Sequence, residues 1–408
     1  MYLKFAWRYF KAKKSANAIN IIAWVTVGVI AFATCCQILV LSVFNGFEDL
    51  VKSLYSSFYT DIKVTPAKGK TFTITTQQIA SIRQQPAVEN LSLEAEEKAL
   101  LKNKNNEAQT VVYLKGVDDN YPKVSGVAGK TNRGIYNTGS IDDPYLVAGA
   151  GIQNAVAINI DPAFPSDSLT LILPKRNSEN NDPLQSISEG NVKAAGVFTI
   201  QQEFDERYAI TNIGFVKQQM AFAADEYSGV EIKLRPKEDP VAAGAAMQKL
   251  LGPNYKILTR YEQNTSLYNT MKMEKWAIYA VLTLILIIAA FNMVSALTML
   301  VLEKRKDISV LQSMGTGRNS ILKIFLAEGI LLAGIGAAAG IGLSILICFI
   351  QMKFKLIKIT GGSFLIDYFP VKLIVTDFLL VTATVAAIAF IAAWFPARKA
   401  SRQSFELR

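Results

Sequence analysis

Residues that commonly carry chemistry are sparse in this chain, which contains no histidine. Catalysis by Ser-His-Asp or Cys-His groups, zincin-type metal sites and histidine-based pH sensing are therefore excluded. Gly-Lys-Thr occurs at residues 69–71 and 129–131, but valine stands at positions 64 and 124, where a phosphate-binding loop needs glycine. The chain also lacks a Gly-x-Ser-x-Gly elbow, a Cys-x-x-Cys pair and clustered metal ligands. We expect no catalytic residue, metal or cofactor on this chain.

The segment at residues 303–318 carries the most informative spacing. It connects two long apolar runs, and Ile308, Leu311 and Met314 recur in it at helical intervals before Gly315. A short helix with exposed apolar side chains would fit a groove on a partner protein. The alternative is a helix that only rests on lipid.

The elements that must position this segment are apolar runs, each longer than the roughly 20 residues that span a bilayer as a helix. They are residues 21–43, 276–302, 324–350 and 373–395. We therefore predict an α-helical membrane protein with four transmembrane helices. The first run contains Ala31-Phe32-Ala33, which fits a signal-peptide cleavage site, but its apolar character continues beyond that point and favours an uncleaved anchor.

Lysine and arginine concentrate on one side of these runs, which predicts that both termini are cytoplasmic. Residues 48–273 and the loop at 351–372 then lie outside, although four lysines in and beside that loop weaken the rule locally. This basic border accounts for the net charge of +10, so we expect contact with anionic lipid and no nucleic-acid partner. The border residues are Lys4, Arg8, Lys11, Lys13, Lys14, Lys304, Arg305, Lys306, Arg318, Lys323, Arg398, Lys399, Arg402 and Arg408.

Three further features of the membrane part are predicted. Residues 1–20 alternate apolar and basic stripes and are typical of an amphipathic surface helix. Gly336 and Gly340 form a Gly-x-x-x-Gly face for close helix packing, within the chain or across a dimer. Glu328 lies near the cytoplasmic end of the third run. Two roles are open for it: a gate or coupling charge, or an acid whose side chain reaches out of the membrane toward Arg305 or Lys306.

Residues 48–273 are too long for a loop and alternate β-like segments with turn residues. This pattern predicts one α+β domain, inserted between the first two helices, with a β-α-β unit at each end and a β-rich insertion at about 120–228. Residues 51–58 and 262–274 contain no helix breaker, so both spans should extend outward as rigid stalks that can transmit displacement. The predicted strands are residues 61–65, 88–101, 108–117, 168–173, 196–202, 230–235 and 255–259, with helices at 76–85 and 239–251.

Motifs at the membrane borders resemble a known family. They are Asn-Gly-Phe-Glu at 45–48, Glu-Lys at 303–304, Asp-Ile at 307–308, residues 311–315, and Phe-Pro-Ala-Arg-Lys-Ala at 395–400. Together with the architecture, they resemble ABC-transporter permeases of the MacB/FtsX type and, more narrowly, the lipoprotein-releasing LolC/LolE type. The chain departs from that pattern at residues 404–408, where the usual proline before the final Leu-Arg is missing.

The resemblance implies a non-catalytic permease subunit of the bacterial inner membrane, with its large domain in the periplasm. Two permease chains, identical or related, would pair with a cytoplasmic ABC ATPase dimer that binds ATP and Mg²⁺. The substrate would be a lipoprotein that passes to a periplasmic carrier. Rival interpretations are a MacB-like efflux permease and an FtsX-like signal transducer that activates a cell-wall hydrolase.

The resemblance also assigns roles along the chain. ATPase coupling would involve Glu303, Lys304, Asp307, Ile308, Leu311, Met314 and Gly315. A lipoprotein cavity would be lined by Leu39, Val43, Phe44 and Phe47 with Trp276, Tyr279 and Leu282. The predicted partition is a surface helix at 1–20, a first helix and stalk at 21–47, a periplasmic domain at 48–273, a second helix at 274–302, a coupling helix at 303–318, a third helix at 324–350, a periplasmic loop at 351–372, a fourth helix at 373–395 and a cytoplasmic tail at 396–408.

Overall fold

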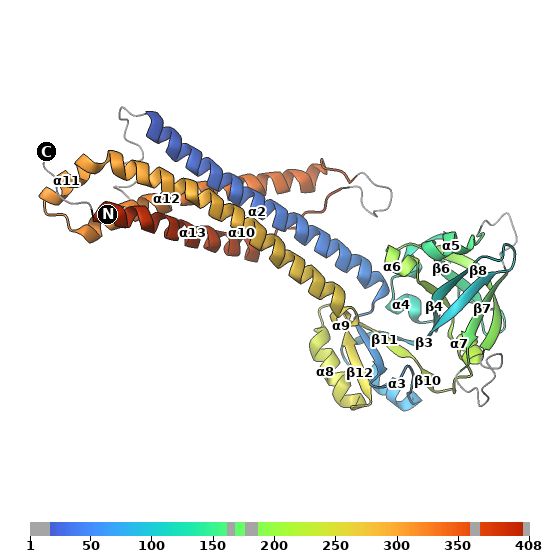
Figure 1. The fold of residues 1–408 in the computed structure, drawn as a ribbon. Helices are drawn as coiled ribbons and strands as arrows, with labels where there is room; N and C mark the ends of the chain where they lie inside the picture. Colours follow the sequence, from blue (N-terminus) through green and yellow to red (C-terminus); the bar gives the residue numbers. More distant parts are fainter. Residues whose placement is uncertain (1–16, 161–167, 176–186, 360–367, 403–408) are drawn as a thin grey trace. The chain divides into compact units, whose positions relative to one another are not determined.

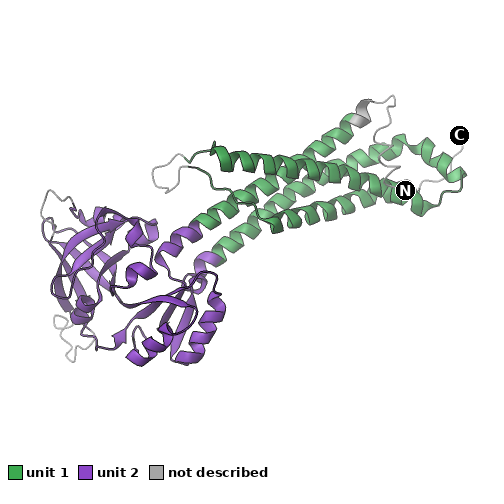
Figure 2. Ribbon diagram, turned by 180° about the vertical axis from the view of Figure 1, so that it is seen from behind, with its two compact units in different colours: residues 1–50, 269–408 green, residues 51–268 purple. Residues whose placement is uncertain are grey.

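A computed structural model describes residues 17–160, 168–175, 187–359 and 368–402. The chain divides into two compact units (Figure 2), a membrane unit of residues 1–50 and 269–408 and a β-rich unit of residues 51–268. Most of the predicted surface helix at 1–20 and the end of the tail at 396–408 lie outside the described residues.

The membrane unit is built from long helices that are apolar enough to cross a bilayer (Figure 1). They are α2 (Asn17–Phe58), α10 (Thr265–Glu303), α12 (Arg318–Phe354) and α13 (Val375–Ser401). Helices α2, α10 and α12 each contain a predicted apolar run and extend beyond it at both ends, whereas α13 begins two residues after the start of its run and extends beyond its end. Buried side chains from all four helices, including Ile38, Met293, Leu332 and Val381, form one hydrophobic cluster.

The stalk expected over residues 262–274 is interrupted at its start. Asn264 has φ −139° and ψ 59°, which separates the short helix α9 (Arg260–Gln263) from α10. Thr259 and Glu262 form a capping box at α9, with the Glu262 carboxylate accepting from the Thr259 amide at 2.9 Å, so this turn begins as a helix of its own. In contrast, α2 continues without a break through residues 51–58.

The Gly-x-x-x-Gly face of α12 packs within the chain against α2. A Cβ atom at Gly340 would lie 2.4 Å from the Ala31 carbonyl oxygen, and one at Gly336 would lie 2.9 Å from the Val27 carbonyl oxygen. These distances leave no room for a side chain, so the two helix backbones approach each other closely, as small residues allow in membranes. Of the two alternatives left open by the sequence, packing within the chain is the one observed.

The β-rich unit contains one large sheet with strand order β12-β1-β11-β3-β4-β9-β6-β8-β5, and β7 pairs with β3 and β8. A separate two-stranded sheet pairs β2 with β10. The strands are β1 (Ile62–Pro66), β2 (Phe72–Thr73), β3 (Val88–Asn103), β4 (Gln109–Val117), β5 (Thr131–Gly134), β6 (Tyr145–Gly149), β7 (Ser168–Pro174), β8 (Ile187–Phe198), β9 (Tyr208–Asn212), β10 (Glu226–Tyr227), β11 (Gly229–Leu234) and β12 (Tyr255–Thr259).

One end of this sheet is formed by the two β-α-β segments at the limits of the unit. In the order β12-β1-β11-β3 all neighbouring pairs are antiparallel, and β11 lies between β1 and β3. The segments β1-α3-β3 and β11-α8-β12 therefore interleave as a split, ferredoxin-like β-α-β arrangement. Helix α3 (Thr76–Arg83) begins at a Thr75–Gln78 capping box, and α8 (Pro240–Leu251) begins at Asp239 with proline at its first position.

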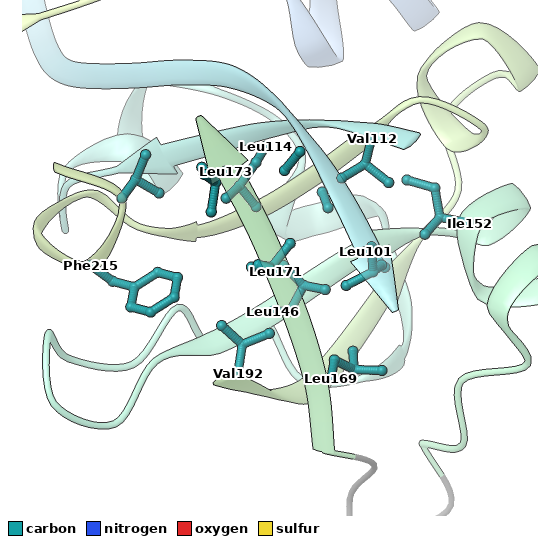
Figure 3. Packing of buried hydrophobic residues seen from close by; sticks show 14 of the residues in the cluster. Leu101, Val112, Leu114, Leu146, Ile152, Leu169, Leu171, Leu173, Val192 and Phe215 are labelled. Carbon is teal, nitrogen blue, oxygen red and sulfur yellow. The ribbon is translucent and has the colours of Figure 1, made fainter. Parts of the chain in front are cut away.

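The insertion between these segments has its own core (Figure 3), formed by side chains of β3, β4, β6, β7 and β8 with α5 (Ala150–Val156) and α7 (Ile213–Met220). Leu101, Leu114, Leu146 and Leu171 are almost fully buried there. Short helices α4 (Tyr121–Val124), α6 (Gln202–Asp205) and the 3₁₀ turn η1 (Ala128–Lys130) complete the unit.

One strand prediction in the insertion is wrong. The strand expected at residues 196–202 is the end of β8, which begins at Ile187 and stops at Phe198. The chain then turns into α6. There the Asp205 carboxylate accepts a hydrogen bond from the Ile200 amide at 2.9 Å, so this amide is not available to pair with a neighbouring strand.

A buried charge network crosses the sheet from β1 to β4. Lys115 Nζ lies 2.5 Å from Glu231 Oε1 and 3.1 Å from Glu94 Oε2, and Lys63 Nζ lies 2.6 Å from Glu94 Oε1. Burial raises the pKa of Glu231 to about 7 against the attraction of Lys115, and the Glu94 charge adds to the rise. Burial also acts on Glu94, but Lys115 and Lys63 outweigh it and hold the Glu94 pKa well below its usual range.

Replacing Gly340 tests the close contact in the membrane unit. Gly340→Ala should lower the free energy of unfolding by about 1–3 kcal/mol, because the new methyl group meets the α2 backbone. Gly342→Ala on the same helix is the control, since no atom lies within 4 Å of a Cβ there, and it should leave stability unchanged or slightly raised. Thermal unfolding in detergent measures both, and equal losses would contradict the assigned role of Gly340.

Because the pKa of Glu231 is raised in the folded protein, the free energy of unfolding of the β-rich unit should fall as the pH rises. The folded unit keeps a proton that an unfolded carboxyl with a pKa near 4.5 releases, so stability falls between about pH 4.5 and 7. Glu231→Gln mimics the neutral form and should reduce the loss between about pH 5 and pH 8 by on the order of 1 kcal/mol. Unfolding of the full chain at both pH values tests this, with the exposed Glu89→Gln as control. Identical pH dependence in all three proteins would refute it.

Candidate coupling and substrate sites

The predicted coupling segment contains a short helix, α11 (Arg305–Ser313), between α10 and α12. Ile308 is only 2% exposed and packs with side chains from the neighbouring ends of the bundle, among them Val301, Phe325 and Ala397. The expectation that Ile308 is an exposed contact is therefore wrong. It faces the place where α10, α12 and α13 meet, so it anchors α11 to the bundle.

The exposed apolar side chains of this segment are Val310 and Met314, at 57% and 77% exposure, with Leu311 partly exposed beside them. Val310 and Met314 are four residues apart and thus lie on one helical face. Val310 was not among the predicted contacts, although its spacing from Met314 could have indicated it. A helix anchored by one buried isoleucine and exposing apolar groups on another face suits docking into a groove.

The polar residues predicted for coupling surround this apolar face. Glu303 and Asp307 are exposed, and Lys304 Nζ forms an ion pair with the Asp307 carboxylate at 3.2 Å. Gly315 has φ +85°, a conformation that favours glycine, and its amide closes the turn on the Gln312 carbonyl. Gly315 therefore shapes the turn after α11, and the charged residues border the exposed apolar face.

Glu328 lies inside the helix bundle at 3% exposure. Among the described residues it forms no ion pair with Arg305 or Lys306, both of which are exposed, and its Oε2 has no hydrogen-bond partner. The interpretation as an acid that reaches toward those two residues does not fit this burial. The role of a gate or coupling charge stays a prediction.

The residues predicted to line a cavity lie on the adjoining parts of α2 and α10. Trp276 is 56% exposed and makes an edge-on contact with Tyr279 at 5.7 Å between ring centroids. The Tyr279 hydroxyl in turn hydrogen-bonds Thr384 of α13. Phe47 meets Phe369 edge-on at 5.8 Å. The other predicted residues, Leu39, Val43, Phe44 and Leu282, are half-buried.

The seven predicted residues lie outside the pocket that the structure describes in the bundle. This pocket is small, and its lining comes from residues such as Ile30, Met293 and Val385 and includes none of the seven. The predicted set is therefore a partly exposed apolar surface at one end of the bundle. The assignment of these residues to a lipoprotein cavity stays a prediction.

The end of α2 is held inside the β-rich unit by aromatic contacts. Phe58 stacks on Phe204 at 4.3 Å and packs against Tyr208 at 4.5 Å. The Lys115 ammonium lies 5.0 Å from the Phe58 ring centre, and the Tyr55 hydroxyl donates to Glu203 at 2.5 Å. The last turns of α2 are thus part of the core of this unit.

The segments that end α2 and begin α10 are tied together within the same unit. Arg260 forms an ion pair with Asp61 at 2.8 Å and donates from Nε to the Tyr59 carbonyl at 3.1 Å. Gln263 donates to the Thr60 carbonyl at 2.9 Å. These bonds join residues about 200 positions apart in the sequence, so the end of α2 and the short helix α9 that precedes α10 are fixed to each other within the β-rich unit.

Two family models match the chain. Residues 23–250 match the MacB-like periplasmic core domain, and residues 279–405 match the FtsX-like permease C-terminal domain. The first match covers more than half of the chain, and together the two leave only short segments unmatched.

Full-length relatives point to the same branch. The chain is 24% identical to lipoprotein-releasing system transmembrane protein LolC of Xylella fastidiosa, over 97% of this chain and 95% of that protein. It is 25% identical to LolE of Haemophilus influenzae over 97% and 96%, and 25% identical to LolC of Neisseria meningitidis over 97% and 95%. These matches confirm the resemblance to the LolC/LolE type. With a MacB-like core domain between its first and second long helices and an FtsX-like C-terminal part, the chain belongs to the MacB/FtsX-like permease family.

Proposed function

We propose that this chain is the transmembrane permease subunit of an ABC transporter that extracts lipoproteins from the bacterial inner membrane and passes them to a periplasmic carrier. The observation that carries the proposal is α11, anchored through Ile308 and exposing Val310 and Met314, in a chain similar over its full length to lipoprotein-releasing permeases. A separate ATPase would supply the energy, with ATP and Mg²⁺ bound there.

The proposed orientation places both termini and α11 in the cytoplasm and residues 51–268 in the periplasm. The basic residues around α11 and at the ends of the chain support this orientation. A second permease chain, identical or related, would complete the transporter together with an ATPase dimer. Its apolar surface would enclose the cavity for the lipoprotein together with the half-buried residues of α2 and α10.

The free energy of moving a lipid anchor supports an energy-driven mechanism. Burial of acyl chains contributes about 0.8 kcal/mol per methylene, so withdrawing one chain of about fifteen methylenes costs roughly 12 kcal/mol. Unassisted release would therefore be slow. The permease would lower this cost by offering an apolar surface to the acyl chains, with ATP hydrolysis supplying the remaining drive.

Force transmission in this proposal runs through α2 and α10. The ATPase would move α11, and the hydrophobic cluster shared by the four long helices would carry that displacement through the bundle. At the other end, the Arg260–Asp61 pair and the aromatic contacts of Phe58 would make the β-rich unit respond to both helices together.

Depletion of the protein separates this function from its rivals. Lipoproteins destined for the outer membrane should accumulate in the inner membrane, measured by membrane fractionation and immunoblotting. Normal lipoprotein sorting with a defect in cell separation would instead favour a signal transducer, and normal sorting with loss of drug or peptide export would favour an efflux permease.

Substitution of Met314 tests the coupling role of α11. Met314→Asp should reduce co-purification of the ATPase by at least about tenfold, because a charge would enter an apolar groove. Val310→Asp should act in the same way. Met273→Asp is the matched control, since this methionine on α10 is also exposed, at 67%, but lies far from α11 in the sequence. ATPase recovery at wild-type levels with both α11 variants would exclude the assigned contact.

A further inference from the structure

Three polar side chains from α2, α10 and α13 meet at the end of the membrane bundle that lies away from α11. Asn45 donates from Nδ2 to Asp377 Oδ2 at 2.6 Å, and its Oδ1 accepts from Lys275 Nζ at 2.9 Å. Lys275 Nζ also lies 3.1 Å from Asp377 Oδ1. Each residue contacts the other two, and each comes from a different helix. We refer to Asn45, Lys275 and Asp377 as the border triad.

Two members of the border triad are buried, whereas the Lys275 side chain is 27% exposed. Asn45 is 2% exposed and Asp377 is 7% exposed. A buried carboxylate or amide is costly unless it is paired, so each member depends on the other two. Moving α2 away from α10 and α13 would break both Asn45 hydrogen bonds and leave its buried amide unpaired, while the Lys275–Asp377 ion pair would remain. The triad therefore favours one arrangement of the three helices.

Residues after α12 hold the same part of α2 from another side. A Cβ atom at Gly46 would lie 2.3 Å from the Pro370 carbonyl oxygen, so only glycine fits there. The Lys372 amide donates to the Ser42 carbonyl at 2.9 Å, and Phe369 contacts Phe47. In the Asn-Gly-Phe sequence at 45–47, Asn45 thus contacts Asp377 of α13, Gly46 lies against Pro370, and Phe47 contacts Phe369.

The border triad also lies among the residues predicted to receive the acyl chains. Phe44 and Phe47 flank Asn45 on α2, and Trp276 follows Lys275 on α10. The Tyr279–Thr384 hydrogen bond makes a second link from α10 to α13 on the same side of the bundle. The spacing between these apolar side chains therefore depends on the contacts that the triad makes.

We propose that Asn45, Lys275 and Asp377 are positioning residues that hold α2 and α10 to α13, so that a displacement of the bundle driven from α11 reaches the apolar surface that takes the lipoprotein. This inference rests on the proposed function and assigns its coupling to three residues. The Lys275 ammonium already contacts two partners, which argues against a primary role in binding an anionic lipid headgroup.

Reconstitution of the permease with its ATPase and a fluorescent triacylated lipoprotein in proteoliposomes tests the proposal. ATP hydrolysis and carrier-dependent release are measured together, and their ratio gives the coupling. Asn45→Ala removes only the α2 link and keeps the Lys275–Asp377 ion pair. It should lower the lipoprotein released per ATP by about tenfold, the effect of losing a hydrogen bond to a charged group, while ATP hydrolysis stays within about twofold of wild type.

Exchange of the charges provides the rescue. Asp377→Asn alone should uncouple release as Asn45→Ala does, whereas Lys275→Asp combined with Asp377→Lys should restore coupling to within about threefold of wild type. Rescue is possible because the Asn45 amide can donate to an acid at 275 and accept from a lysine at 377. Asp49→Asn is the control, since it breaks only the exposed pair with Lys372 and should leave coupling unchanged.

Several results would overturn the assignment. Wild-type coupling in Asn45→Ala and Asp377→Asn would do so. The variants could instead lose ATP hydrolysis, lipoprotein release and thermal stability together, with no rescue by the charge exchange. That result would indicate a structural role alone and would also overturn the assignment. If the wild-type complex hydrolyses ATP but releases no lipoprotein, the proposed function fails and this inference falls with it, which is distinct from a defect confined to the variants.

Discussion

The unbroken backbone of α2 is the constraint on which this structure depends. Its intrahelical hydrogen bonds run from Asn17 to Phe58, a length of about 63 Å, whereas the hydrocarbon core of a bilayer is about 30 Å thick. One end of the helix packs in the membrane bundle, and the other is fixed among Phe204, Tyr208 and Lys115 of the β-rich unit. Residues of this one helix thus contribute to the cores of both units.

Two kinds of contact hold α2 in the membrane unit. Its inner part meets the glycine face of α12 at Gly336 and Gly340, where backbone approaches backbone without intervening side chains. Its far part is held by the border triad and by Gly46 against Pro370. Close packing favours one helix position, and paired buried polar groups penalise departures from it. The same helix is therefore both well packed and polar at the point where it leaves the bundle.

Local patterns in the sequence predicted the four long helices and the two β-α-β segments, because apolar runs and turn residues are local signals. The contacts that decide the sites are not local. The exposed position of Ile308 was mispredicted because helical spacing does not show which face the ends of α10, α12 and α13 cover. The border triad joins Asn45 to Asp377 across 332 positions, so neither motif nor periodicity could pair them. The end of β8 depended on a carboxylate in the next turn, which strand propensity does not register.

In the proposed function, this chain converts the nucleotide cycle of a neighbouring ATPase into release of a lipid-anchored protein. The most direct measurement reconstitutes the purified permease in proteoliposomes with a triacylated lipoprotein, adds the carrier outside, and compares release with and without the ATPase. We expect release only when ATPase, ATP and carrier are all present, and no ATP hydrolysis by the permease alone. Release that is equally fast without the ATPase, or ATP hydrolysis by the isolated chain, would contradict it.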